Sequence, residues 1–288
     1  MVDKNLTDLM SELMNMDRLK YIRIIMQSRD GARSIDIAEE ISKSKGITDP
    51  EEIKKENIKV NKRLRNLVDL SVLVSKEGEY TISSLGRLLM TSWEELEKNA
   101  EAIEEFKEFF DNHYVDDLPQ EFFLQMYKLR KAELTENSVQ WEVGVREYMK
   151  TMKRKFYNMT EYLHDMPEEI IRKKEDGEIE EMSIIYQFRN YPELNYRDEW
   201  DLFDRLTKAG VEFRFMTLKE KHPIGIRIVD EEWATFGLAR ISDGKLDRGQ
   251  AFVGTDKDFI TWCRDLMYHM WHFRATSLIV EEVRAKNE

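Results

Sequence analysis

Residues 57–70, NIKVNKRLRNLVDL, constrain the fold of this chain more than any other segment. At the 100° per residue of an α-helix, the apolar side chains fall on one arc and the polar ones on the opposite arc. The first arc holds Val60, Leu64, Leu67 and Val68, and the second holds Lys59, Lys62, Arg63 and Asn66. One face can pack on a small core while the other meets DNA, because cations neutralise phosphates and Arg or Asn side chains contact base edges. The alternative is a basic face that is only solvated.

The segments around this stretch predict a winged helix-turn-helix. Helices are expected at residues 13–27 and 34–45, the second closed by Gly46. After Leu70, two β-rich runs flank the polar turn 76–79, which is typical of a hairpin, and a further helix follows. Thr48-Asp49-Pro50-Glu51 is expected to start another capped segment, which leads into residues 57–70. The connection 45–56 is longer than the tight turn that usually precedes a recognition helix.

We expect double-stranded DNA to be contacted by the predicted recognition helix, residues 57–70, and by the tip of the hairpin. The predicted DNA-binding residues are Lys59, Asn61, Lys62, Arg63, Arg65, Asn66 and Lys76. The alternative is a winged helix that serves as a protein-interaction adaptor and never touches DNA. That adaptor would keep its function after a charge reversal at Lys62 and Arg63.

The net charge of −12 is unevenly distributed. The chain through Ser92 carries 16 basic and 15 acidic residues, so the remaining 29 basic and 42 acidic residues hold the negative charge. Because electrostatic binding depends on the local patch, an acidic second half does not exclude DNA binding by the first.

Three parts are expected along the chain: a DNA-binding domain at 1–92, a linker and dimerisation helix at 93–112, and an effector or dimerisation domain at 113–288. Apolar residues continue through the linker at near-heptad spacing, which favours a homodimer, although packing within the chain is the simpler alternative. They are Leu89, Trp93, Leu96, Ala100, Ile103 and Phe110.

The last part alternates strands and helices, which indicates an α/β layer structure. Strands are expected at 132–135, 182–188, 211–218, 224–229 and 233–239, with a sheet-edge strand at 250–254. Helices are expected at 139–164, 198–209 and 256–275. The fold class is therefore α+β in the first part and α/β in the last.

The sequence resembles archaeal transcriptional regulators of the methanogenesis-regulator (FilR-like) family. The resemblance rests on LTDLMSELMNMDRLKYIRIIM, EGEYTISSLGRLL and FKEFFDNHYVDDLPQEFFLQMYKLRKAELTEN, and on the later pieces GVEFRFMTL and GIRIVDEEWATFGLAR. It implies a DNA-binding regulator whose phospholipase-D-like C-terminal domain senses a ligand or dimerises. The connection 45–56 and the acidic segment 172–181 depart from the family pattern.

Catalysis is not expected. Phospholipase-D chemistry needs a His nucleophile, a Lys two residues later and an acid five residues further on. From His222 those places hold Ile224 and Val229, and Arg227 and Asp230 are at most remnants of such a site. The alternative, a degenerate phosphodiesterase, predicts turnover that mutation of His222 abolishes. The chain also lacks nucleotide-binding glycine motifs, so no cofactor is expected.

A sensor pocket for a small anionic metabolite is predicted at the strands of the α/β part, where arginines and aromatic side chains gather. The candidate ligand-binding residues are Tyr186, Arg189, Arg214, Arg227 and Trp233. The alternative is that the arginines pair with acids and the aromatic residues form core. No metal site is expected, because His269 and His272 have no third ligand nearby.

The sequence has no run of eighteen apolar residues and only one cysteine, Cys263. No membrane partner is therefore expected, and a reducing cytoplasm is the predicted location. The prediction from the sequence is a cytoplasmic, homodimeric winged-helix transcription regulator.

Overall fold

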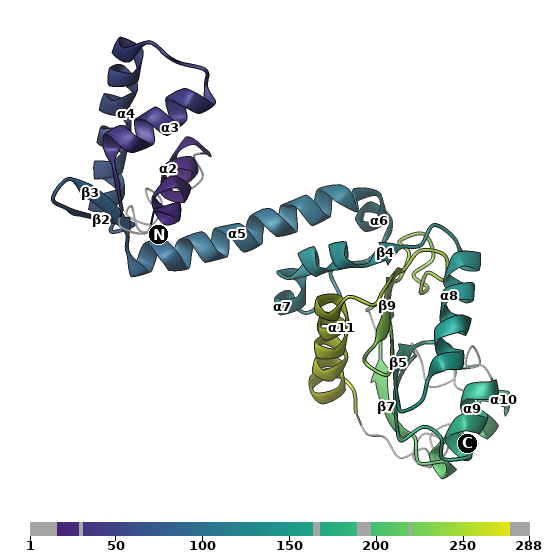
Figure 1. Ribbon diagram of the computed structural model, residues 1–288. Coiled ribbons are helices and arrows are strands. Elements are labelled where there is room, and N and C mark those ends of the chain that lie inside the picture. Colours follow the sequence, from purple (N-terminus) through teal and green to yellow (C-terminus); the bar gives the residue numbers. More distant parts are fainter. Residues whose placement is uncertain (1–15, 29–30, 164–167, 189–196, 219–220, 277–288) are drawn as a thin grey trace. The chain divides into compact units, whose positions relative to one another are not determined.

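A computed structural model describes residues 16–28, 31–163, 168–188, 197–218 and 221–276. The chain divides into two compact units, Met1–Glu95 and Leu96–Glu288. Helix α5 (Ser84–Glu105) begins in the first unit and ends in the second (Figure 1). The predicted boundary at residue 92 and the division at residue 95 both fall within this helix.

The N-terminal unit is a winged helix-turn-helix. Its elements are α2 (Met16–Gln27), β1 (Ala32–Arg33), α3 (Ser34–Ser44), α4 (Pro50–Asp69), β2 (Leu73–Lys76) and β3 (Glu79–Ile82), followed by the start of α5. The three strands form a small sheet in the order β1-β3-β2. One apolar core joins the helices to the hairpin and includes Leu19, Ile22, Ile37, Val60, Leu64, Leu67, Leu73 and Met90.

The predicted hairpin is confirmed, with a turn of two residues. Glu77 and Gly78 have φ values of 54° and 84°, so both lie in the left-handed region, as a type I′ turn requires. This turn matches the twist of the paired strands, and it places Lys76 opposite Glu79 at the tip of the wing.

Helix α4 begins at Pro50, seven residues before the predicted start at residue 57. Gly46 ends the preceding helix with a φ of 70°, and the Asp49 carboxylate caps α4 by accepting the N–H of Glu51 at 3.1 Å. Pro50 at the first helical position loses no hydrogen bond, because that N–H has no partner within the helix. The predicted long connection 45–56 is therefore wrong: only five residues separate α3 from α4.

Among the residues that the structure describes, the C-terminal unit is built on a mixed sheet of seven strands in the order β4-β10-β9-β8-β5-β6-β7. The strands are β4 (Glu133–Leu134), β5 (Lys155–Thr160), β6 (Glu181–Phe188), β7 (Glu212–Thr217), β8 (Ile224–Val229), β9 (Trp233–Leu238) and β10 (Phe252–Gly254). β5, β6 and β7 are parallel, and the remaining pairs are antiparallel. The predicted fold class is confirmed: a winged helix is followed by an α/β layer structure.

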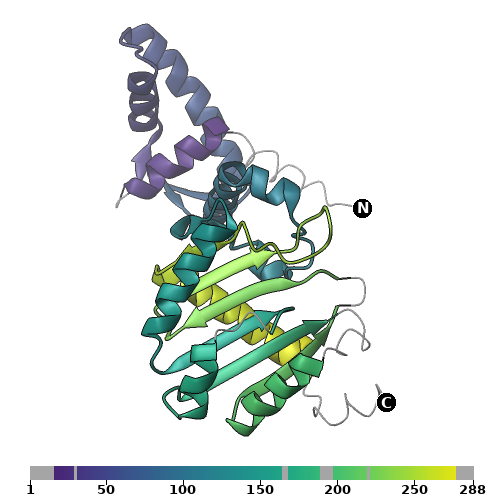
Figure 2. The ribbon, with the colours of Figure 1, turned by 90° about the vertical axis from the view of Figure 1, so that its right-hand side faces the viewer.

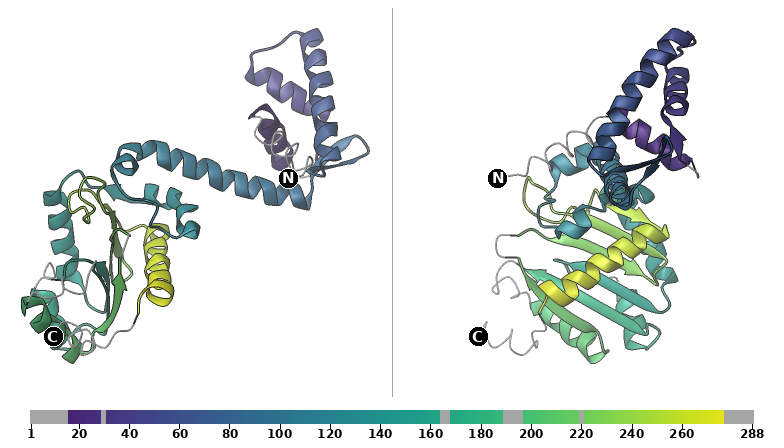
Figure 3. Two further views of the ribbon diagram at one scale, coloured as in Figure 1. Left: turned by 180° about the vertical axis from the view of Figure 1, so that it is seen from behind. Right: turned by 90° about the vertical axis from the view of Figure 1, so that its left-hand side faces the viewer.

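Helices cover both faces of this sheet. One face carries α8 (Ser138–Thr151), α9 (Glu168–Glu175) and α10 (Arg197–Lys208) (Figure 2). The other carries α11 (Lys257–His269), its π-helical continuation Met270–Arg274, the short α7 (Gln120–Phe123) and the 3-10 helix η1 (Met126–Lys131) (Figure 3). No described helix combines the length and the apolar character of a membrane span.

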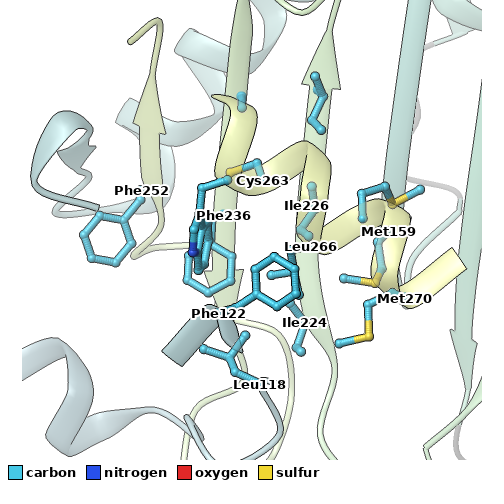
Figure 4. Close-up of a cluster of buried hydrophobic side chains, with 14 of the residues drawn as sticks. Leu118, Phe122, Met159, Ile224, Ile226, Phe236, Phe252, Cys263, Leu266 and Met270 are labelled. Carbon is cyan, nitrogen blue, oxygen red and sulfur yellow. The ribbon is translucent and has the colours of Figure 1, made fainter. Parts of the chain in front are cut away.

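A cluster of buried apolar side chains fills the space between α11 and the sheet (Figure 4). Phe236 of β9 packs edge-on against Trp262 of α11, with ring centroids 4.8 Å apart. Cys263 is fully buried in this core, and burial raises the pKa of its thiol well above the usual value. The thiol therefore stays protonated and unreactive.

The C-terminal half of α5 is held to the second unit by polar contacts. The Asn99 side chain is 6% exposed, donates to the Leu124 carbonyl and accepts the N–H of Tyr127 at 3.0 Å. Arg130 of η1 donates to Glu101 and Glu105 of α5, each at 2.6 Å. An amide and an arginine thus fix the end of the linker helix against α7 and η1.

Two sequence-based expectations about this unit are wrong, and one helix had no prediction. The expected helix 139–164 ends at Thr151 and is followed by β5, because the Asp230 carboxylate accepts the N–H groups of Lys153, Arg154 and Lys155 at 2.7–2.8 Å. The strand β10 lies next to the edge, and β4 occupies the edge itself. Helix α9 was not predicted.

Substituting Gly86 with Ala is expected to destabilise the N-terminal unit. A Cβ at this position of α5 would lie 2.2 Å from the carbonyl oxygen of Val72, so helix and wing must separate. Overpacking costs about 1–3 kcal/mol, more than the roughly 1 kcal/mol that Ala gains over Gly in a helix. Urea denaturation followed by circular dichroism measures the loss. Gly144→Ala is the control, since its Cβ would meet nothing within 4 Å, and equal stability of both variants would contradict the close approach.

Candidate nucleic-acid interface and ligand site

The exposed face of α4 is a cationic stripe. Val60, Leu64 and Leu67 are fully buried, which turns the opposite side of the helix to solvent. The exposed stripe, called the α4 face below, consists of Lys54, Lys55, Ile58, Lys59, Lys62 and Arg65. These residues recur at intervals of three or four, so they follow one side of the helix.

Four of the predicted DNA-binding residues are exposed: Lys59, Lys62, Arg65 and Lys76. Lys76 stands at the end of β2, beside the turn of the wing. The Lys59 ammonium lies 3.6 Å from the Glu56 carboxylate, which also accepts from Lys45 at 3.1 Å. Glu56 is 8% exposed, so a largely buried acid holds one cation of the face in place.

Asn61 and Arg63 lie at the border between the two arcs and contact the protein itself. Arg63 donates to the hydroxyl of Tyr21 at 2.6 Å, and its guanidinium carbon lies 5.8 Å from the centre of that ring. Asn61 accepts from the hydroxyl of Tyr80 at 2.9 Å. These side chains fix α4 to α2 and to the wing. Asn66 is half-buried, so the placement of all the polar residues on one free arc is only partly right.

The sequence prediction missed three members of the α4 face. Lys54 and Lys55 lie in the capped segment that was expected to start at 48–51, and this segment is the N-terminal part of the same helix. Ile58 is 67% exposed in the middle of the stripe. An exposed aliphatic side chain among cations suits contact with a thymine methyl group.

Acidic residues limit where this helix can approach a phosphate backbone. Glu51 and Glu52 are exposed in the first turn, and Asp69 is exposed at the end. Phosphates are therefore repelled at both ends of α4 and attracted along its middle. A Glu near the N-terminus can still accept a hydrogen bond from a cytosine amino group.

The predicted ligand-binding residues do not form one site. Tyr186, Arg227 and Trp233 lie on the sheet face covered by α8, α9 and α10, but Arg214 lies on the face of α11. The alternation of β7 explains this, since Phe213 and Phe215 point to the first face and Arg214 between them points to the second. Arg214 donates to the carbonyl of Trp271 and lies 4.7 Å over its ring. Arg189 lies outside the described residues.

Tyr186 and Trp233 are packed in the core of their face. Tyr186 is 4% exposed and meets Phe203 edge-on at 5.3 Å, and Trp233 is 1% exposed and stacks on Tyr148 at 4.9 Å. Arg227 is 6% exposed and lines a cavity of about 30 Å³ with Asn158, Thr160 and Thr235. That is far below the roughly 300–1,000 Å³ of small-molecule sites.

Asp247 closes the same cavity and is held by a buried histidine. Its carboxylate lies 3.1 Å from Nε2 of His113 and accepts the N–H groups of Gly249 and Gln250. Burial alone would raise the pKa of Asp247, but these hydrogen bonds outweigh it, and the pKa lies below its ordinary value. The ionised carboxylate therefore anchors the loop before β10.

His222, the candidate nucleophile of the phosphodiesterase alternative, stands just before β8. Its ring stacks on Tyr114 with centroids 3.5 Å apart, and Nδ1 lies 3.0 Å from the Asp117 carboxylate. Asp230, the other suggested remnant, is engaged by three backbone N–H groups at the start of β5. Within the described part of the chain, no three His, Cys, Asp or Glu side chains gather as metal ligands would.

No family model matches this chain, and no curated protein matches it. Among solved structures, it is similar to TrmBL2, an archaeal chromatin protein with a novel mode of DNA binding (14% identity, TM-score 0.39, 77% of this chain and 83% of that one). It is also similar to NucT from Helicobacter pylori (12% identity, TM-score 0.37, 50% of this chain and 98% of that one).

A third similar structure is Nuc from Salmonella typhimurium, a phospholipase D family member (12% identity, TM-score 0.37, 50% of this chain and 95% of that one). With TM-scores below 0.4, none of these likenesses assigns a function to the chain. The resemblance to FilR-like regulators stays a prediction.

The different positions of Arg63 and Lys62 predict different effects on stability. Arg63→Ala is expected to lower the free energy of unfolding by about 1–2 kcal/mol, because it removes a hydrogen bond and a cation–π contact to Tyr21. Lys62→Ala removes an exposed side chain and is expected to change the free energy of unfolding by less than about 0.5 kcal/mol. Urea denaturation of both variants tests this, and a larger loss for Lys62→Ala would refute the placement.

Proposed function

We propose that this protein is a transcription regulator that binds double-stranded DNA through its winged helix-turn-helix. The observation that carries the proposal is the α4 face, where five cations and Ile58 stand exposed on the helix that follows the turn. In this fold the corresponding helix enters the major groove. Lys76 at the tip of the wing is positioned to contact the adjacent phosphate backbone.

The electrostatics support a local rather than a global attraction. Charges separated by more than about 8–10 Å are largely screened at physiological salt. The cations of the α4 face therefore act on phosphates in direct contact, and the acidic residues of the second unit suppress loose association. Binding of this kind depends on salt, since each neutralised phosphate releases a counterion.

Catalysis forms no part of the proposed function. A phospholipase-D-type reaction needs a Lys and an acid at the places that Ile224 and Val229 occupy after His222. Both side chains are buried and apolar, at 2% exposure each. The second unit serves the regulator, in this proposal, by dimerisation and ligand sensing.

Replacing Lys59, Lys62 and Arg65 together with Ala is expected to weaken DNA binding and its salt dependence. Three lost phosphate contacts would reduce the slope of log K against log salt by about 2–3. Fluorescence anisotropy with a labelled duplex at several salt concentrations measures both quantities.

The matched control replaces Lys150, Lys208 and Lys257, three exposed lysines of the second unit, with Ala. This control removes three positive charges, as the α4 variant does, and is expected to leave the slope of log K against log salt unchanged. Equal effects of the two triple variants would show that net charge, and not the α4 face, governs binding.

We propose further that the regulator is a homodimer joined along α5. Leu88, Leu96 and Ile103 are 69%, 54% and 40% exposed, and such side chains on one helix face favour pairing with a second copy. A dimer places two recognition helices on half-sites about 34–36 Å apart, one turn of DNA.

The double variant Leu96→Glu with Ile103→Glu is expected to be monomeric, because paired copies would bury four carboxylates against each other. Light scattering coupled to size-exclusion chromatography measures the mass in solution. Thr91→Glu, on another side of α5, is the control and is expected to leave the dimer intact. A dimer that survives the double variant would place the interface elsewhere.

A further inference from the structure

A groove opens between α8 and the edge of the large sheet, away from the cavity at Arg227. Its volume is about 550 Å³, within the range of roughly 300–1,000 Å³ that small-molecule sites occupy. One wall is α8 and the other is formed by β4, β9 and β10. The lining residues include Val139, Val143, Gly144 and Tyr148 on α8 and Glu133, Thr135, Trp233, Val253 and Thr255 on the sheet side.

The α8 side of this groove is largely apolar and open to solvent. Val139 is 68% exposed and Val143 is 52% exposed, although both are β-branched apolar residues on a helix that covers the sheet. Tyr148 stacks on Trp233 with ring centroids 4.9 Å apart and an angle of 17° between the rings. The Tyr148 ring, which is 36% exposed and is backed by Trp233, stands beside the open valine side chains and offers a flat surface to a ring-containing occupant.

Trp233 is the buried part of this lining. Its side chain is 1% exposed, and its Nε1–H has no acceptor among the described residues. The Nε1 atom is itself shielded from solvent, so it is not among the groups that an occupant of the groove meets. The hydroxyl of Thr135 is already engaged with the carbonyls of Gly249 and Ala251.

The charge of the lining selects against anions. Of the lining residues that the structure describes, Glu133 alone carries a charge, and no Lys or Arg faces the groove. An anion would meet repulsion and no ion pair, whereas an uncharged or cationic compound is accepted. This differs from the anionic metabolite predicted at Arg227, whose cavity is a separate one.

We propose that this groove binds small, uncharged or cationic ring compounds between α8 and the sheet. It also lies close in the chain to the anchor of the linker helix. Glu133 and Thr135 follow η1 directly, and Arg130 of η1 holds Glu101 and Glu105 of α5. An occupant therefore touches the strand that continues from that anchor; its use as a regulatory signal rests on the proposed DNA-binding function.

The test compares two fluorescent probes of one skeleton on the full chain without DNA. N-phenyl-1-naphthylamine is uncharged, and 8-anilinonaphthalene-1-sulfonate carries a sulfonate. We expect the uncharged probe to bind with one site per chain and about tenfold or more tighter than the sulfonate. Equal affinity for the two probes, or stronger binding of the sulfonate, would overturn the proposal.

Gly144→Leu locates the binding. A Cβ at Gly144 meets nothing within 4 Å, and Leu is favoured over Gly in a helix, so the variant folds while its side chain fills the groove. Gly144→Leu is expected to lower the affinity for the uncharged probe by about tenfold or more. Lys150→Leu adds the same side chain to an exposed position of α8 outside the lining and is expected to bind as the wild type does.

Unchanged binding by Gly144→Leu would also overturn the proposal, since the probe would then lie elsewhere. Because the assay contains no DNA, its result is independent of the proposed regulator function. If the chain binds the probe in this groove but does not bind DNA, the proposed ligand site is supported and the proposed regulator function is refuted.

Discussion

The packing of Val60, Leu64 and Leu67 decides which side of α4 meets solvent. Each side chain is fully buried, and burying an aliphatic side chain stabilises a fold by about 1.5–3 kcal/mol. An exposed ion pair along the same helix contributes only about 0.2–0.5 kcal/mol. The hydrophobic seam therefore fixes the rotation of the helix, and the cations face outward as a consequence. Arg63 on Tyr21 and Asn61 on Tyr80 make the same rotation specific.

Apolar packing together with a few polar contacts also determines the fold of the second unit. Apolar side chains on both faces of the sheet form two cores, and a few polar groups determine where elements begin and end. The Asp230 carboxylate stops α8 and starts β5 by accepting three backbone N–H groups. Asn99 and Arg130 dock the linker helix. Asp230, suggested as a remnant of a catalytic site, thus has a structural role at the junction of α8 and β5.

Much of the fold was predictable from the sequence, because local patterns determine it. The β-rich runs around Glu77-Gly78 and the strands β6 to β9 follow from alternation and turn residues. Asp49-Pro50 signals a capped segment locally, but the sequence does not show that this segment and residues 57–70 form one continuous helix. The end of α8 could not be found, since the responsible carboxylate at Asp230 lies 75 residues away from Lys155. The predicted ligand-binding residues lie on both faces of the sheet. Alternation along β7 places Arg214 opposite Phe213 and Phe215, but the sequence does not reveal that these phenylalanines share the face of Tyr186.

Contact of the α4 face with DNA can be tested directly, because Cys263 is buried. Its thiol is inaccessible, so a cysteine introduced at Ile58, which is 67% exposed, can be labelled alone with an iron chelate that cleaves nearby DNA. Strand cleavage from Ile58→Cys, with none from Lys208→Cys on the second unit, is the predicted result. Equal cleavage from both positions, or none from Ile58→Cys in a complex that still forms, would contradict the account.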